Sequence, residues 1–159
     1  MLKPLKQWLC DGCGEVIESP EQGCLEWLWN EDDDSKAHCF RIVHLDSYSP
    51  HKSSPHCYHY EDQWNRTDGR LDRYVGRGGL TKLLGFLDHD ACTASTGPRV
   101  TDVGELVEII RRLHVPYYEE ARQHFRKAIT DGLLDGWGGD NPTPGSMKLI
   151  IEKYSSQPA

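Results

Sequence analysis

The part of the sequence most able to do chemistry is the run Cys10-Asp11-Gly12-Cys13-Gly14. A C-x-x-C turn holds two thiolates about 3.5–4 Å apart, which is half of a tetrahedral zinc site with Zn–S bonds of about 2.3 Å. Gly14 can adopt the positive φ that such a turn often requires. Strands are expected on both sides, and no proline separates the cysteines, which argues against a redox pair of the thioredoxin type. We therefore predict zinc binding, with a redox or reactive pair as the alternative.

A zinc site needs two further ligands, and His44 and Cys57 are the candidates. His44 ends an expected strand. It lies on the same face of that strand as Phe40 and Ile42, because side chains alternate between the two faces, and this aims its ring inward. Cys57 ends the irregular loop that follows this strand. The predicted Cys₃His site consists of Cys10, Cys13, His44 and Cys57. The rival ligands for its second half are His38, Cys39, His56 and His59.

On Cys10–Gly14 this arrangement resembles the zinc-knuckle and treble-clef finger proteins in general. The long interval from Cys13 to His44, with strands between, is similar to the finger of the poly(ADP-ribose) polymerases. Those fingers close their site with His-x-x-Cys, whereas twelve residues separate His44 from Cys57 here. The resemblance implies a finger-like fold with a structural zinc ion. The whole chain looks like a small bacterial-type zinc protein with a helical C-terminal half.

Other parts of the sequence carry weaker chemical signals. His51, His56 and His59 could hold a second, open-sided metal that activates water, as in a metal-dependent hydrolase or nuclease. Asp88-His89-Asp90, followed by Cys92, offers further ligands, although a solvated turn at a helix end is the preferred interpretation. The glycine-rich run Gly76–Gly79 predicts a linker that interrupts the helices, and a phosphate-binding loop is the alternative. We find no sequence motif of a nucleophilic hydrolase or a zinc protease.

Composition divides the chain near residue 67. Residues 1–67 contain five of the six cysteines and four of the five tryptophans, with 6 basic against 12 acidic side chains. Residues 68–159 are nearly neutral, with 12 against 13. We therefore predict a zinc-knuckle β subdomain over 1–67 and a helical subdomain over 68–159.

The charge and hydropathy of the chain limit its function and its compartment. The formal net charge of −7 argues against a general nucleic-acid coat, which needs a basic surface. No apolar run approaches the roughly 18 residues of a membrane span, so no membrane role is expected. The N-terminal segment lacks the apolar region of a secretory signal. We therefore expect a cytoplasmic protein whose cysteines are thiols or metal ligands.

Short strands are expected in the first part. Residues 7–9 and 15–17 flank the C-x-x-C turn, and 23–30 and 37–44 alternate as strands do, with a hairpin tip at 31–35. The resulting antiparallel sheet has three or four strands and too small a hydrophobic core to be stable alone. A bound metal ion that cross-links its segments (a zinc staple) is therefore expected. Leu25, Trp27 and Trp29 share one face. Trp27, Trp29 or Trp64, if exposed, would mark an interface with a protein partner.

Residues 68–159 are predicted to form four or five short helices. They cover 80–87, with 71–75 as a possible addition, 102–113 behind a capping box at Asp102, 117–130, and a last helix from Thr143-Pro144. Segment 102–130 resembles a helix-turn-helix, and its cationic residues could form a basic face: Arg111, Arg112, Arg122, Arg126 and Lys127. However, Glu119 and Glu120 stand where a recognition helix meets bases, which disfavours DNA binding.

The sequence therefore predicts an α+β protein, with a zinc-stapled antiparallel sheet followed by a helical bundle. Its expected cofactor is structural Zn²⁺, and its expected role is non-catalytic binding of a protein partner. A DNA-binding regulator and a metal-dependent hydrolase are the alternatives.

Overall fold

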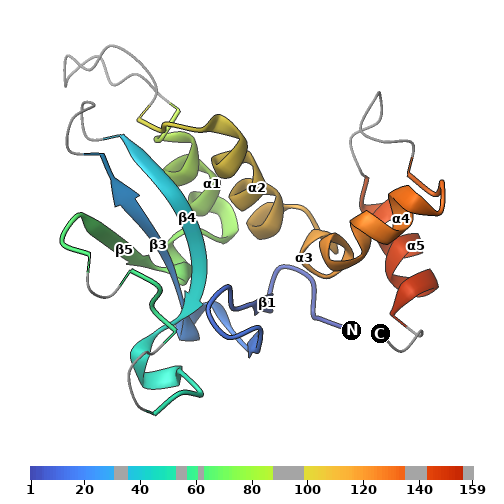
Figure 1. Cartoon of the computed structure of the whole chain (residues 1–159), viewed down its shortest axis with the longest axis horizontal. Coiled ribbons are helices and arrows are strands. Elements are labelled where there is room, and N and C mark those ends of the chain that lie inside the picture. The colour runs from blue at the N-terminus through green and yellow to red at the C-terminus, as the bar shows by residue number, and fades with distance from the viewer. Residues whose placement is uncertain (31–35, 53–56, 61–62, 88–98, 135–142, 156–159) are drawn as a thin grey trace.

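The computed structural model describes residues 1–30, 36–52, 57–60, 63–87, 99–134 and 143–155. The chain has the predicted α+β fold, with short antiparallel strands first and helices after them (Figure 1). One three-stranded sheet lies against α1 and α2, while α3 to α5 form a separate group at the other end of the molecule (Figure 1). Among the described residues, no helix combines the length and apolar character needed to cross a membrane.

The C-x-x-C run forms the turn of a small hairpin, as predicted. Strands β1 (Trp8–Leu9) and β2 (Val16–Ile17) pair antiparallel, with Trp8 opposite Ile17. The turn is closed by hydrogen bonds from the Cys10 N–H to the Glu15 carbonyl at 2.9 Å and from the Gly14 N–H to the Cys10 carbonyl at 2.8 Å. Gly14 has a φ of 77°, which is the left-handed conformation expected there.

The main sheet has the strand order β4-β3-β5. Strands β3 (Gly23–Trp29) and β4 (Ala37–His44) are the two predicted ones, and the expected hairpin tip at 31–35 lies outside the described residues. Strand β5 (Arg66–Arg70) was not predicted, because its sequence RTDGR has no apolar alternation. It pairs with β3 as an edge strand, where polar side chains are common.

Two helices begin at recognisable signals, and a third begins where the sequence did not predict it. Helix α2 (Val103–His114) is capped by the Asp102 side chain, which accepts a hydrogen bond from the Gly104 N–H at 2.6 Å. Helix α5 (Pro144–Tyr154) is capped by Thr143, which accepts from the Ser146 N–H at 3.2 Å. Helix α1 (Gly76–Leu84) begins earlier than predicted. The run Gly76–Gly79 is its first turn and not a linker, because Gly79 packs so closely on the Tyr74 backbone that a Cβ would collide with it.

The predicted helix over 117–130 is wrong as a single element. It consists of α3 (Tyr118–Ala121), a 3₁₀ turn over Arg122–His124, and α4 (Phe125–Thr130). The possible helix over 71–75 is likewise a 3₁₀ turn, at Leu71–Arg73. A helix-turn-helix with one continuous second helix is therefore absent from segment 102–130, all of which is described.

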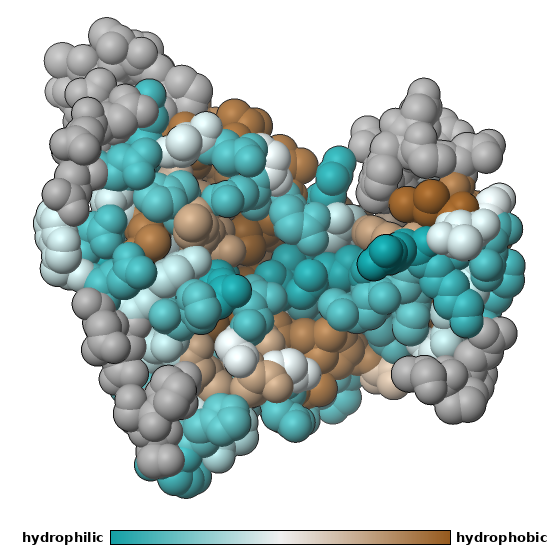
Figure 2. All heavy atoms as spheres, in the orientation of Figure 1, coloured by the Kyte–Doolittle hydropathy of each residue, from teal (hydrophilic) through white to brown (hydrophobic). Residues whose placement is uncertain are grey.

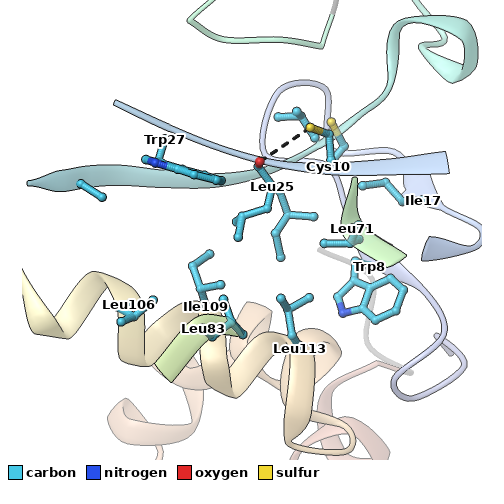
Figure 3. Close-up of a cluster of buried hydrophobic side chains, with 14 of the residues drawn as sticks. Trp8, Cys10, Ile17, Leu25, Trp27, Leu71, Leu83, Leu106, Ile109 and Leu113 are labelled. Carbon is cyan, nitrogen blue, oxygen red and sulfur yellow. Dashed lines mark hydrogen bonds between the residues drawn. The ribbon is translucent and has the colours of Figure 1, made fainter. Parts of the chain in front are cut away.

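The buried apolar side chains form two clusters. The larger runs from Trp8 to Leu113 and joins the sheet to α1 and α2, where Leu25 faces Ile109 and Leu113 (Figure 3). The smaller runs from Tyr118 to Tyr154 and joins α3, α4 and α5. The predicted division after residue 67 falls inside β5, so the first cluster draws on both predicted subdomains.

Trp27 is buried, so it is not the exposed interface residue considered from the sequence. Its side chain is 5% exposed and contacts Phe40, Tyr74 and Phe86, with ring centroids 6.0, 6.2 and 5.3 Å away. Trp29 is half-buried and donates from Nε1 to the Thr67 hydroxyl at 2.6 Å. Trp64, in contrast, is 77% exposed.

The opposite face of β3 is covered by segment 57–60. Glu26 is fully buried there, and its carboxylate accepts a hydrogen bond from the His59 N–H at 3.0 Å. Its second oxygen, Oε2, has no hydrogen-bond partner among the described residues. Burial raises the pKa of the Glu26 carboxyl, against the opposing effect of backbone N–H groups at His59 and Tyr60.

Replacing Glu26 by glutamine should stabilise the fold at neutral pH. Since the pKa of Glu26 is raised in the folded chain, folding favours the protonated carboxyl, and its contribution to stability is lost as the pH rises through the folded pKa. Glutamine keeps the acceptor for the His59 N–H without the charge. We expect urea unfolding to show the variant more stable than wild type at about pH 8, with a smaller difference at about pH 5.

Glu152→Gln is the matched control, because Glu152 is an exposed carboxylate on α5. It should change stability little at either pH. A stability difference for Glu26→Gln that stays constant with pH would show that the buried carboxyl is not the origin of the effect.

Candidate metal centre

Four donor side chains meet at the end of the sheet beside the β1–β2 turn. They are the four residues of the predicted site, and their donor atoms all lie within 4.8 Å of one another: Cys10, Cys13, His44 and Cys57. Cys10, His44 and Cys57 are buried, while Cys13 is partly exposed. Three separate segments therefore supply the group, namely the hairpin turn, the end of β4 and the segment that begins at residue 57.

The histidine sits at the distances that a tetrahedral metal requires. Its Nδ1 lies 3.5 Å from the Cys13 sulfur and 3.6 Å from the Cys57 sulfur. Metal–sulfur bonds of about 2.3 Å and metal–nitrogen bonds of about 2.0–2.1 Å, at tetrahedral angles, place such atoms about 3.5–3.6 Å apart. Nδ1 of His44 is therefore the atom positioned to bind a metal.

The other ring nitrogen of His44 fixes the ring. Nε2 lies 3.3 Å from the Val16 carbonyl oxygen, to which it donates when Nδ1 is the unprotonated ligand atom. Burial lowers the pKa of His44, which favours the neutral imidazole that a metal needs. Strand β2 thus orients a residue of β4 for coordination.

Cys57 is held from two sides. Its sulfur lies 3.2 Å from the buried Ser49 hydroxyl, and the same hydroxyl oxygen accepts a hydrogen bond from the His51 N–H at 3.1 Å. Its backbone carbonyl packs against Gly12, where an added Cβ would collide with the carbonyl oxygen. Gly12 is therefore the residue that lets the hairpin turn approach Cys57. The contact of Ser49 with Cys57 was not predicted, because a single serine carries no sequence signal.

The electrostatics of the group favour a cation among the donors. Burial raises the pKa of the Cys13 thiol to about 12 and also raises that of Cys57. Like charge from a neighbouring Cys10 thiolate acts in the same direction. A bound divalent cation reverses this balance, because it stabilises the thiolates directly.

The rival ligands lie elsewhere. His38 Nδ1 is 3.1 Å from the Cys39 sulfur, and neither residue belongs to the four-residue group. His59 is exposed beside Glu26, and His56 lies outside the described residues. Cys24 is buried in the sheet. In the part of the chain that the structure describes, these residues, like His51, join no other metal-binding group, while Asp88–Cys92 lies beyond that part.

Asp11, between the two knuckle cysteines, anchors the turn to β4 and to helix α2. Its backbone N–H donates to the Ile42 carbonyl, and its Oδ2 accepts from the Ile42 N–H, both at 2.8 Å. The same oxygen accepts from Nη1 of Arg112 at 2.7 Å. Oδ1 lies 3.4 Å from Nη2 of Arg122.

Arg112 is the centre of this buried ionic network. It is 4% exposed, and besides Asp11 it binds Glu119 on α3 through two hydrogen bonds of 2.7 and 2.9 Å. The paired carboxylates raise its pKa, although burial alone would lower it. Arg122 also donates to Glu119, at 3.1 Å. Arg112 therefore does not belong to the basic face considered from the sequence, because it lies inside, and Arg122 is engaged in the same network.

No protein-family model matches the chain, and no significant match is found among curated proteins or solved structures.

Proposed function

We propose that Cys10, Cys13, His44 and Cys57 bind one structural zinc ion in a non-catalytic protein. The observation that carries this proposal is the convergence of three sulfurs and one imidazole nitrogen within 4.8 Å. Three thiolates and one imidazole form a donor set typical of structural zinc. Four protein ligands complete a tetrahedron, which leaves no coordination position for a substrate or a water.

A zinc ion would supply what the small N-terminal sheets lack. Strands β1 and β2 have two residues each, and an isolated hairpin is at best marginally stable in water. Structural zinc sites contribute about 10–16 kcal/mol of apparent binding free energy. Bound here, the ion would tie the hairpin, the end of β4 and segment 57–60 together.

In its general construction, the proposed site resembles those of the zinc-knuckle and treble-clef fingers. Support comes from the C-x-x-C turn between two short strands and from the distant second pair of ligands. The His-x₁₂-Cys spacing of His44 and Cys57 differs from the His-x-x-Cys of the poly(ADP-ribose) polymerase finger. We therefore extend the likeness to the construction of the site and not to DNA recognition.

We further propose that the chain binds a protein partner through Trp64. Its side chain is 77% exposed, whereas Trp8 and Trp27 are buried. The turn that carries it is fixed to β3, since Asn65 Nδ2 donates to the Trp29 carbonyl at 2.6 Å and the Trp29 N–H donates to the Asn65 carbonyl at 3.0 Å. A large aromatic side chain held outward on an ordered turn is a typical anchor of protein interfaces.

Metal analysis tests the zinc site. We expect plasma mass spectrometry to find about one zinc ion per wild-type chain and to find it lost in Cys10→Ser, His44→Ala and Cys57→Ser, because a closed site needs all four ligands. Cys24→Ser and Cys39→Ser are matched controls that remove thiols outside the group and should keep the metal. A wild-type chain without zinc, or controls that lose it as readily, would refute the assignment.

Ser49→Ala should weaken zinc binding without abolishing it. The hydroxyl is 3.2 Å from the Cys57 sulfur, and loss of such an outer contact typically costs about 10- to 100-fold in metal affinity. Competition with a chromophoric chelator measures the change. Ser146→Ala, which removes a hydroxyl at the α5 cap, should leave the affinity unchanged. Equal affinities in wild type and Ser49→Ala would contradict the role given to Ser49.

Trp64→Ser tests the partner surface. The variant should keep its zinc content and its unfolding transition, because the indole is exposed, while it loses proteins that the immobilised wild-type chain retains from cell extract. Tyr48→Ser, at an exposed aromatic residue in another segment, should retain them. Identical retention by the wild type and Trp64→Ser would overturn the proposed surface.

A further inference from the structure

We propose that metal binding at the Cys₃His centre controls the docking of the C-terminal helical unit, Tyr118–Tyr154, on the rest of the chain. The inference rests on the proposed zinc site and adds a regulated contact to it. The two apolar clusters are joined by ion pairs and hydrogen bonds that involve the metal-site hairpin.

The two clusters of buried apolar side chains share no residue. Tyr118 and Ala121 of α3 are buried with α5, so α3 turns its apolar side toward the second cluster. Its acidic side, with Glu119 and Glu120, faces the N-terminal part of the chain. The surface over α3, between the two ends of the molecule, is mainly hydrophilic (Figure 2). Charged groups and hydrogen bonds therefore carry much of the contact at this junction.

The β1–β2 hairpin supplies the partners of that acidic side. The Leu9 N–H donates to Glu119 at 3.1 Å, and the Leu9 carbonyl accepts from Arg112 at 3.1 Å. Trp8 donates from its indole to the Arg112 carbonyl, also at 3.1 Å. These two residues immediately precede the ligand Cys10. The α2–α3 corner is thus bound by the same hairpin that carries two of the four metal ligands.

Asp11 links the metal-binding turn directly to the arginines of the α2–α3 corner. Its neighbours in the chain are Cys10 and Gly12, and its carboxylate contacts both Arg112 and Arg122. With Cys10 and Cys13 bound to a metal, the turn is fixed and the carboxylate is held in place. Without the metal, the turn is held by two strands of two residues and by the hydrogen bonds of Asp11 to Ile42 and Arg112. A displaced Asp11 leaves the buried guanidinium of Arg112 with fewer partners, which is strongly destabilising for a buried ion pair.

The metal is also open to removal. Cys13 is partly exposed, while the other three ligands are buried. A chelator or a competing metal-binding protein can therefore approach the centre at Cys13. Release of the ion at that point would be transmitted through Asp11 to Arg112 and Glu119, and so to the position of α3.

Amide hydrogen exchange on the full chain tests the inference. In the zinc-loaded wild type, amides of α3 and α5 should be protected, and they should exchange about tenfold or more faster after zinc is removed by a chelator. Asp11→Asn removes the charge without removing a ligand. It should keep its zinc and the protection of the β1–β2 amides, while α3 and α5 exchange faster even with zinc bound.

Glu119→Gln breaks the same network from the helical side, and it should give the same pattern with its zinc content unchanged. Glu152→Gln is the matched control within the C-terminal unit, because it removes an exposed carboxylate of α5, which forms an ion pair with Lys148 at 3.9 Å. It should leave exchange of α3 and α5 as in wild type.

The outcomes separate this inference from the proposed site. A chain that binds no zinc refutes both. Zinc-loaded Asp11→Asn and Glu119→Gln with wild-type protection in α3 and α5 overturn the coupling alone, and the zinc site then stands. A wild-type chain whose α3 and α5 amides exchange equally with and without zinc overturns the coupling in the same way.

Discussion

The constraint on which the N-terminal part depends is that four donor side chains, three of them buried, must share one small volume. The three thiols, which lie with the imidazole within 4.8 Å of one another, cannot all become thiolates without a cation, and burial raises the pKa of Cys13 and Cys57. Groups in such a position are stabilised when a metal neutralises them. The surrounding structure is arranged for this: Val16 orients His44, and Gly12 leaves room for Cys57. Both contacts place a ligand and have no other evident purpose.

The features that could be predicted from the sequence are those with a local signal. The turn at Cys10–Gly14 has a fixed residue pattern, and β3 and β4 show alternation. Asp102 and Thr143 are side chains that cap helices through neighbouring N–H groups, so α2 and α5 were found close to their observed starts. The convergence of His44 and Cys57 with the knuckle was inferred from the position of each after a strand or a loop, and the structure brings both residues there.

The features that could not be predicted depend on contacts between distant residues. Strand β5 is polar and exists because β3 offers it an edge. The glycines at 76–79 look like a linker, yet Gly79 is required by the nearby Tyr74 backbone. Arg112 and Arg122 look like solvent-facing cations on amphipathic helices, because nothing in their neighbourhood reveals Asp11, which is about a hundred positions away along the chain. Sequence periodicity cannot distinguish a surface arginine from one that meets a distant carboxylate.

The charges around the knuckle explain why those arginines are inside. Asp11 places a carboxylate between two cysteines that become thiolates on metal binding, and this arrangement would be repulsive by itself. Arg112 and Arg122 neutralise it, while Glu119 accepts hydrogen bonds from Nε and Nη2 of Arg112. Replacing such a network by apolar side chains often leaves stability unchanged or higher, so its presence is better explained by the orientation that it imposes. Since its geometry includes the turn that carries Cys10 and Cys13, the same few charges fix that turn against α2 and α3.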